Sequence, residues 1–233
     1  MNVFIVYAHH EPRSFNGAMR DTAVAELTEL GHQLQVSDLY AMRFKAWSDG
    51  DDFLKRAKPD FLKYQNEQKH AFETDSFTPD IKAEQEKLLW CDILILQFPL
   101  YWQGLPAILK GWIDRVLAVG FAYGGGRWYN SGPLRGRKAL VAMTTGGLAD
   151  RFRADGLFGD INWILHPLRV GTLNFVGLDT LEPFIAWGPA SIGADKRQEY
   201  LAAWRGKLRR LEHEPPQPFR NLADFPDPKL RDH

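Results

Sequence analysis

The sequence is poor in features that would indicate a disulfide-linked, membrane-spanning or nucleic-acid-binding protein. It contains one cysteine, Cys91, so an intrachain disulfide is excluded. Lysine plus arginine and aspartate plus glutamate number 29 each, and this zero formal net charge gives no support for nucleic acid or an acidic membrane as the main partner. No apolar run reaches the ~20 residues that a membrane-spanning helix needs.

Several catalytic and metal-binding signatures are missing as well. The sequence has neither a Gly-x-Ser-x-Gly elbow nor a P-loop. His9 and His10 are adjacent and point in different directions, and the other histidines lack supporting Cys or Asp at ligand spacing, so we expect no metal site. No motif surrounds Cys91, which we expect to be a buried small hydrophobe and not a nucleophile.

The length and the first residues favour one large cytoplasmic domain. A chain of 233 residues can bury a sizeable core. Residues 1–8 lack a basic region and a small-residue cleavage site, so they predict a first strand and not a signal peptide. We expect a folded domain over residues 1–212 and an irregular, proline-containing tail over 213–233.

Strands and helices alternate along the chain. The apolar patterns predict strands at 2–8, 33–39, 92–98 and 138–144, strand material near 174–187, and helices at 14–30, 79–89, 106–119, 160–168 and 195–211. This alternation predicts an α/β protein with a doubly wound parallel sheet and helices on both faces, and five strands favour the flavodoxin-like order. Residues 40–77 form a long polar excursion with many charges; we expect helical stretches within it, but the sequence does not locate them.

The most informative segment follows the apolar strand 92–96. Ligands in open α/β sheets bind outside the carboxyl ends of the strands, and Tyr101 and Trp102 offer flat faces there that suit a planar ring. Pro106 then begins a helix, where its missing N–H is harmless. Core aromatics are the alternative interpretation of the two rings.

Two further strand ends carry residues that a phosphorylated cofactor would use. His9, Arg13 and Ser14 lie at a helix amino terminus, which favours a phosphate, although no Gly-x-Gly-x-x-Gly is present and a dinucleotide site of the Rossmann type is disfavoured. Glycines in the 144–147 segment let the backbone approach a ligand. A capped polar loop and a tight turn are the respective alternatives; the convergence of three strand ends favours a planar, phosphorylated cofactor.

The chain also resembles the flavin-dependent NAD(P)H:quinone oxidoreductases, the DT-diaphorase-like family, which includes bacterial quinone reductases and ancillary subunits of potassium-efflux systems. The similarity spans roughly residues 3 to 211, and its motifs lie at 14–16, 37–42, 79–85, 97–112, 121–123, 144–147, 159–162 and 181–183. The resemblance implies a flavodoxin-like fold and a homodimer with each active site at the subunit interface.

The resemblance further implies a set of cofactor and substrate contacts. FAD, with FMN the less favoured choice, would be held at its phosphates by His9, Phe15, Asn16 and Ala18. The isoalloxazine would lie against Pro99, Leu100, Tyr101, Trp102, Gln103, Thr144, Thr145, Gly146 and Gly147, with Phe152 nearby. Arg197, and more loosely Gln65, would lie near the adenine end. The quinone and nicotinamide pocket would include Trp102, Gly125 and Phe158, roofed by Tyr123 of the other subunit.

Four departures from the mammalian members bear on substrate choice. Phe152 and Phe158 stand where those enzymes carry a tyrosine and a histidine, Gly125 replaces a second pocket tyrosine, and Gln103 replaces an aromatic residue. The long mammalian carboxyl-terminal extension is missing. These differences leave flavin binding intact and change proton management and acceptor preference.

The implied activity is ping-pong, two-electron reduction of a quinone by NADPH or NADH through flavin N5, with backbone N–H groups of Gly146 and Gly147 stabilising reduced-flavin charge. An azo- or nitro-reductase on the same scaffold is one alternative. A flavin-binding regulatory subunit of a potassium-efflux system, with a membrane-protein partner, is the other. The sequence leaves open the choice between NADPH and NADH, the acceptor, and the role of residues 40–77.

Overall fold

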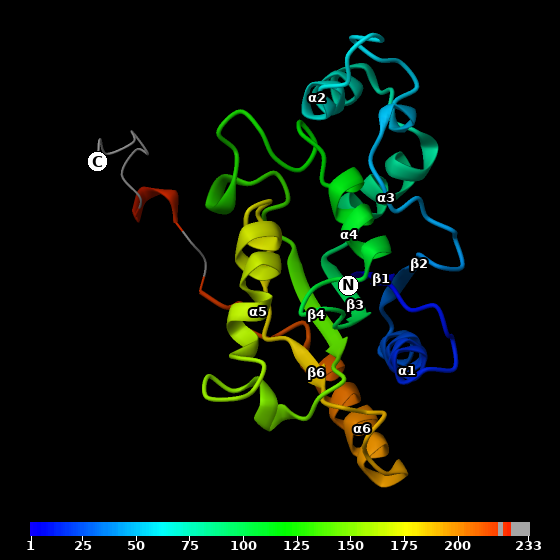
Figure 1. The fold of residues 1–233 in the computed structure, drawn as a ribbon, viewed down its shortest axis with the longest axis vertical. Helices are drawn as coiled ribbons and strands as arrows, with labels where there is room; N and C mark the ends of the chain where they lie inside the picture. The colour runs from blue at the N-terminus through cyan, green and yellow to red at the C-terminus, as the bar shows by residue number, and fades with distance from the viewer. Residues whose placement is uncertain (219–220, 225–233) are drawn as a thin grey trace.

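The computed structural model describes residues 1–218 and 221–224, and its centre is a parallel β-sheet (Figure 1). The strands are β1 (Asn2–Tyr7), β2 (Gln33–Asp38), β3 (Ile93–Pro99), β4 (Lys138–Thr144), β5 (Asp179–Thr180) and β6 (Phe184–Ala186). Their order is β2-β1-β3-β4-β5, with β6 also pairing with β4, and every pair is parallel. The expected flavodoxin-like order is confirmed; the one correction is that the material near 174–187 forms two short strands.

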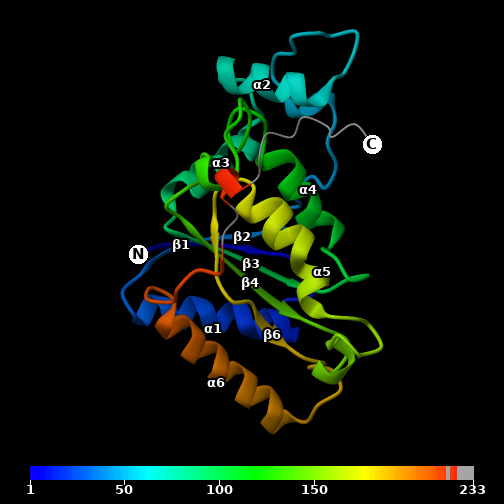
Figure 2. The ribbon, with the colours of Figure 1, turned by 90° about the vertical axis from the view of Figure 1, so that its left-hand side faces the viewer.

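Helices cover both faces of the sheet, as the strand burial requires (Figure 2). Strand β1 is buried on both faces, with Phe4 and Val6 in one core cluster and Val3 and Ile5 in the other. The helices are α1 (Phe15–Glu29), α2 (Tyr64–Thr74), α3 (Pro79–Trp90), α4 (Ala107–Val116), α5 (Ile161–Leu168) and α6 (Ala194–Arg210). Helices α1 and α6 pack on one face, and α3, α4 and α5 pack on the other.

The excursion of residues 40–77 contains structure that the sequence did not place. It holds a 3₁₀ turn (Gly50–Asp52) and α2, and an isolated antiparallel bridge between Phe53 and Phe77 closes it at its base. Helix α2 lies outside the α3–α4 layer, on the side away from the sheet (Figures 1 and 2). The excursion therefore forms an additional layer against the α/β core.

Residues 214–217 of the tail lie against the sheet edge, whereas residues 221–224 contact Asn130 and include a 3₁₀ turn (Leu222–Asp224). The Gln217 N–H donates to the Thr180 carbonyl at 2.7 Å, and Lys138 Nζ donates to the carbonyl of Glu214 at 3.0 Å. Residues 214–218 form no helix or strand, and residues 219–220 and 225–233 of the expected irregular tail lie outside the described residues. Within the described ranges, no helix is both long and apolar enough to cross a bilayer.

Candidate functional site

A cavity of about 790 Å³ opens at the carboxyl ends of β1, β3 and β4, as the strand-end argument predicts. This volume falls in the range of roughly 300–1,000 Å³ that is usual for ligand pockets. The lining residues come from the β1–α1 loop, the β3 and β4 ends, the β6–α6 loop and α6: His9, Arg13, Ser14, Phe15, Asn16, Ala18, Pro99, Leu100, Tyr101, Thr144, Thr145, Gly146, Pro189, Ala190, Arg197, Gln198 and Leu201.

The first turn of α1 forms an anion-binding wall of this cavity. Ser14 is the N-cap, and its Oγ accepts the Gly17 N–H at 3.1 Å. A Cβ at Gly17 would lie 1.8 Å from the Pro12 carbonyl oxygen, so only glycine permits this tight entry into the helix. The first backbone N–H groups of a helix have no intrahelical acceptor, and those of Phe15 and Asn16 lie in the cavity wall, so this wall suits a phosphate.

His9 places an imidazole beside that helix end, in the cavity wall. Burial, together with the adjacent His10, lowers the pKa of His9 below its usual value. Its Nδ1 lies within hydrogen-bond distance of both the Glu11 N–H, at 3.0 Å, and the Glu11 carbonyl oxygen, at 3.1 Å, so Glu11 ties the ring to the loop in either tautomer. The His10 ring stacks on the His9 ring at a centroid distance of 4.7 Å, so the expectation that the two side chains point in different directions is wrong.

Asn16 connects the first turn of α1 to strands β3 and β4 at the floor of the cavity. Its Nδ2 donates to Thr144 Oγ1 at 2.7 Å, and its carbonyl accepts from Gln97 Nε2 at 2.6 Å. Asn16 Oδ1 is buried and has no hydrogen-bond partner among the described residues. An unpaired buried acceptor is unfavourable by about 1–3 kcal/mol, so this oxygen fits a donor on a bound molecule.

The β4 end supplies a backbone cradle. Thr145 Oγ1 donates to the Gly147 carbonyl at 2.7 Å and accepts the Gly188 N–H at 3.3 Å, which holds the turn in place. A Cβ added at Gly146 would meet no atom within 4 Å, so this position opens onto free space. Among the described residues, the N–H groups of Gly146 and Gly147 donate to no protein acceptor. The turn therefore has two N–H groups without a protein acceptor in the described ranges, and Gly146, which lines the cavity, can donate to a ligand edge.

The aromatic loop after β3 is a tight, strained turn. Reciprocal hydrogen bonds of 3.1 and 2.8 Å between the backbones of Tyr101 and Gly104 close it, with Trp102 and Gln103 at φ of 51° and 55°. Positive φ at two non-glycine residues is unfavourable, and such strain concentrates at functional sites. Tyr101 lines the cavity, whereas the Trp102 side chain is fully exposed.

Arg197 on α6 closes the far end of the cavity. Its Nη1 donates to the carbonyls of Pro189 and Ile192 at 3.3 and 2.7 Å, and no carboxylate among the described residues pairs with it. These carbonyls fix the guanidinium in place and leave its full positive charge available to a ligand. The cavity thus has cationic or N–H donor groups at both α1 and α6.

Eleven of the expected cofactor residues line this cavity, and the other expected site residues lie outside it. Those outside are Gln65, Trp102, Gln103, Gly147, Phe152, Tyr123, Gly125 and Phe158. Phe152 and Phe158 pack on each other at 5.1 Å, directly against Gly147. Gln103 lines a separate cavity of about 290 Å³ between α4 and α5.

Tyr123 and Gln65 meet each other and not the main cavity of their own chain. Gln65 Nε2 donates to the Tyr123 hydroxyl at 3.3 Å, and the Tyr123 ring packs on Phe175 at 5.5 Å. We expected Gln65 in the same region as Arg197, and within one subunit the structure does not bring the two together.

Sequence reasoning missed four cavity residues and one aromatic partner. Pro189, Ala190, Gln198 and Leu201 line the cavity, and Trp128 stacks on Phe175. Leu201 could have been found from Arg197, because it follows that residue by four positions on the same helix, and Gln198 lies three positions before Leu201. The other three lie in loops without a sequence motif.

Comparison with known proteins places the chain among oxidoreductases of the flavodoxin-like fold. The family model of the flavodoxin-like fold matches residues 1–209. Mouse ribosyldihydronicotinamide dehydrogenase [quinone] is 43% identical over 215 residues, covering 92% of this chain and 93% of the relative. Guinea pig NAD(P)H dehydrogenase [quinone] 1 is 42% identical over 216 residues, covering 92% and 78%. The crystal structure of a candidate quinone reductase from Klebsiella pneumoniae superposes with a TM-score of 0.92 at 42% identity, covering 95% and 88%.

These identities are measured over nearly the whole chain, and the chain has a cavity at the strand ends, where the fold predicts a ligand. The chain therefore belongs to the NAD(P)H:quinone oxidoreductase family of the flavodoxin-like fold, and it is an oxidoreductase.

Proposed function

We propose that this protein binds FAD in the main cavity and reduces quinones by two electrons, with a reduced nicotinamide as the electron donor. The proposal rests on one observation: the same cavity has two ends that each suit a phosphate, the amino terminus of α1 and the Arg197 guanidinium. A molecule with two phosphates and a second ring system uses both ends, whereas a mononucleotide needs only one. The residues present therefore fit FAD better than FMN.

In this proposal the planar ring of the flavin lies between the two ends of the cavity and the aromatic loop after β3. Tyr101 and Leu100 provide a flat, apolar wall, and the Asn16 and Thr144 side chains lie at its floor. When bound, the flavin supplies the hydride chemistry that links the nicotinamide to the quinone. In this proposal the N–H groups of Gly146 and Gly147, which meet no protein acceptor among the described residues, stabilise negative charge on the ring edge.

The site is proposed to be complete only in a homodimer. Trp102 and Trp163 have strongly exposed aromatic side chains. The residues that follow them, Gln103 and Ile164, line the same small cavity between α4 and α5, so the two tryptophans lie on adjoining elements. Covering them removes a large apolar area from water. Tyr123, which is remote from the cavity of its own chain, would then roof the partner's pocket.

In this proposal Phe152 and Phe158 take no part in proton transfer, which limits the routes by which a proton reaches the acceptor. Neither ring can donate a hydrogen bond or carry a proton, and they pack with Trp187 in an apolar group beside Gly147. Protons must therefore reach the acceptor from solvent or from Tyr123. An apolar pocket of this kind favours bulky, hydrophobic quinones.

Turnover by the purified protein tests this function. We expect released FAD by mass spectrometry, and parallel double-reciprocal plots when a naphthoquinone is reduced. NADPH, NADH and dihydronicotinamide riboside are compared as donors, because the name of the mouse relative specifies the riboside. A protein that is purified without flavin, or that reduces azo or nitro compounds and no quinone, would contradict the proposal.

A further inference from the structure

One face of α2 lies against residues 114–123, the segment that leads from α4 to the Tyr123 loop. Gln65, Gln68 and Phe72 are spaced at i, i+3 and i+7, so they share one side of the helix. Each of the three contacts this segment. The additional layer formed by the excursion therefore contacts the core through α2 and residues 114–123.

Gln68 holds the backbone of this segment. The side chain is 3% exposed; its Nε2 donates to the Asp114 carbonyl at 3.2 Å and its Oε1 accepts the Val119 N–H at 3.3 Å. At Gly120, with φ of +92°, an added Cβ would lie 2.7 Å from the Phe72 ring. Glycine thus lets α2 pack closely on the turn, and both ends of the Gln68 amide are satisfied.

Gln65 holds the side chain of Tyr123. The Gly120 N–H donates to the Tyr123 carbonyl at 2.7 Å, which fixes the backbone of the loop. Gln65 Nε2 donates to the Tyr123 hydroxyl oxygen at 3.3 Å, while Phe175 packs against the ring. A hydroxyl oxygen that accepts this hydrogen bond keeps its own proton for another acceptor.

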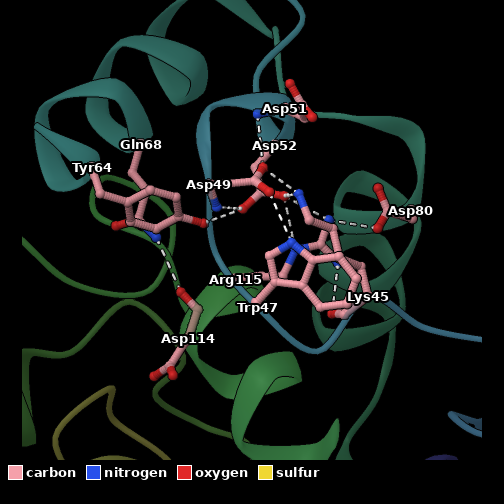
Figure 3. Close-up of polar contacts among 10 residues, drawn as sticks. All are labelled: Lys45, Trp47, Asp49, Asp51, Asp52, Tyr64, Gln68, Asp80, Asp114 and Arg115. Carbon is pink, nitrogen blue, oxygen red and sulfur yellow. Dashed lines mark hydrogen bonds and ion pairs between the residues drawn. The ribbon is translucent and has the colours of Figure 1, made fainter. Parts of the chain in front are cut away.

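A buried ion cluster fixes α2 in turn (Figure 3). Asp52 is fully buried and accepts hydrogen bonds from Arg115 Nε at 3.0 Å, Lys45 Nζ at 2.9 Å and the Tyr64 hydroxyl at 2.7 Å. Arg115 also pairs with Asp80 at 2.7 Å. Tyr64 is the first residue of α2, so this cluster sets the position of the helix relative to α4.

We propose that Gln65 and Gln68 are positioning residues that hold Tyr123 so that its hydroxyl proton points to a carbonyl oxygen of the acceptor. The inference rests on the proposed function, because it takes Tyr123 as a roof residue of the quinone pocket. It assigns the excursion a role in acceptor choice: an acceptor with a carbonyl at this position binds better than one without.

A double-mutant cycle tests the side-chain contact. Gln65→Met keeps the length of the side chain and removes its donor, and we expect a rise in the KM for a quinone of about three- to tenfold, with kcat unchanged. In a Tyr123→Phe background the same substitution has no further effect, because the hydroxyl is gone. Gln65→Glu replaces the donor by an acceptor, so the tyrosine hydroxyl donates to the carboxylate and not to the quinone, and the KM stays raised as in Gln65→Met. Asn66→Met is the matched control on the next residue, and it leaves the KM unchanged.

Amide hydrogen exchange tests the backbone contact without any turnover. We expect Gln68→Met to accelerate exchange at Val119 and Gly120, and Asn66→Met to leave both rates unchanged. Wild-type quinone turnover with an unchanged KM in Gln65→Met, or an equal rise in the Tyr123→Phe background, would overturn the inference. Absence of quinone turnover in the wild type would instead refute the proposed function, and unchanged exchange in Gln68→Met would then refute the positioning role separately.

Discussion

Replacing Arg197 by alanine separates FAD from FMN as the cofactor. The guanidinium is held by the carbonyls of Pro189 and Ile192 and meets no carboxylate among the described residues, so its charge is available to the far end of a ligand. FMN has neither the second phosphate nor the adenine that would reach this end. The substitution therefore weakens FAD binding and leaves FMN binding nearly unchanged.

The magnitude follows from one charge-assisted hydrogen bond. Such bonds contribute about 1.5–3 kcal/mol, which corresponds to a rise of roughly 10- to 150-fold in the dissociation constant of FAD. The assay is titration of flavin-depleted protein with each flavin, followed by flavin fluorescence or calorimetry. Arg205→Ala is the matched control, since it removes a charge two turns further along α6, where the side chain faces Glu26 at 4.0 Å.

Two results would refute this reasoning. An equal loss of affinity for FAD and FMN would mean that Arg197 supports the fold of the cavity and does not meet the second phosphate. FMN as the sole flavin in freshly purified protein would show that the far end of the cavity is unused. A loss of FAD affinity in Arg205→Ala as well would assign the effect to the overall charge of α6.

Three further predictions test the shared site, the proton route and the His9 environment. Co-expressed subunits carrying Tyr123→Ala and Gly146→Trp should regain about one active site per heterodimer if Tyr123 serves the partner's pocket, and dimers without recovered activity would mean that each subunit builds its own site. Phe152→Tyr combined with Phe158→His should speed flavin reduction about tenfold in stopped-flow, because acid–base help becomes available; an unchanged or slower rate with flavin fully bound would show that the rings only pack. Because burial and His10 lower the pKa of His9, the folded state binds fewer protons than the unfolded chain below about pH 6.5, so the free energy of unfolding should fall as pH decreases from there toward the lowered pKa. His9→Gln should reduce that slope in denaturant titrations, and an identical slope would contradict the assignment.

The sequence predicted the sheet and the main cavity because their determinants are local. The buried strands β1, β3 and β4 are continuous apolar runs, and the residues that follow them, such as Asn16 and Thr144, meet where parallel strands end. Ser14 was identified as the cap of α1 for the same reason, since capping depends on neighbouring positions.

The excursion was beyond sequence reasoning because its determinants are distant. Helix α2 is fixed by the contact of Asp52 with Arg115, 63 positions away, and by Gln68 with the α4 end. A pattern of charges at 40–77 predicts a solvated surface, whereas Asp52 is fully buried. This packing places Gln65 beside Tyr123. We expected Gln65 near Arg197, and within one subunit the two residues are therefore not neighbours.

The most direct test of the central claim is an anaerobic two-step stopped-flow experiment on the purified protein. The visible flavin absorbance should be lost on mixing with NADPH or NADH and should return fully after one equivalent of a naphthoquinone. Complete recovery with one equivalent, and release of FAD on denaturation, is the result that the account predicts. Reduced protein that a quinone fails to reoxidise, or protein with no flavin absorbance, would contradict it.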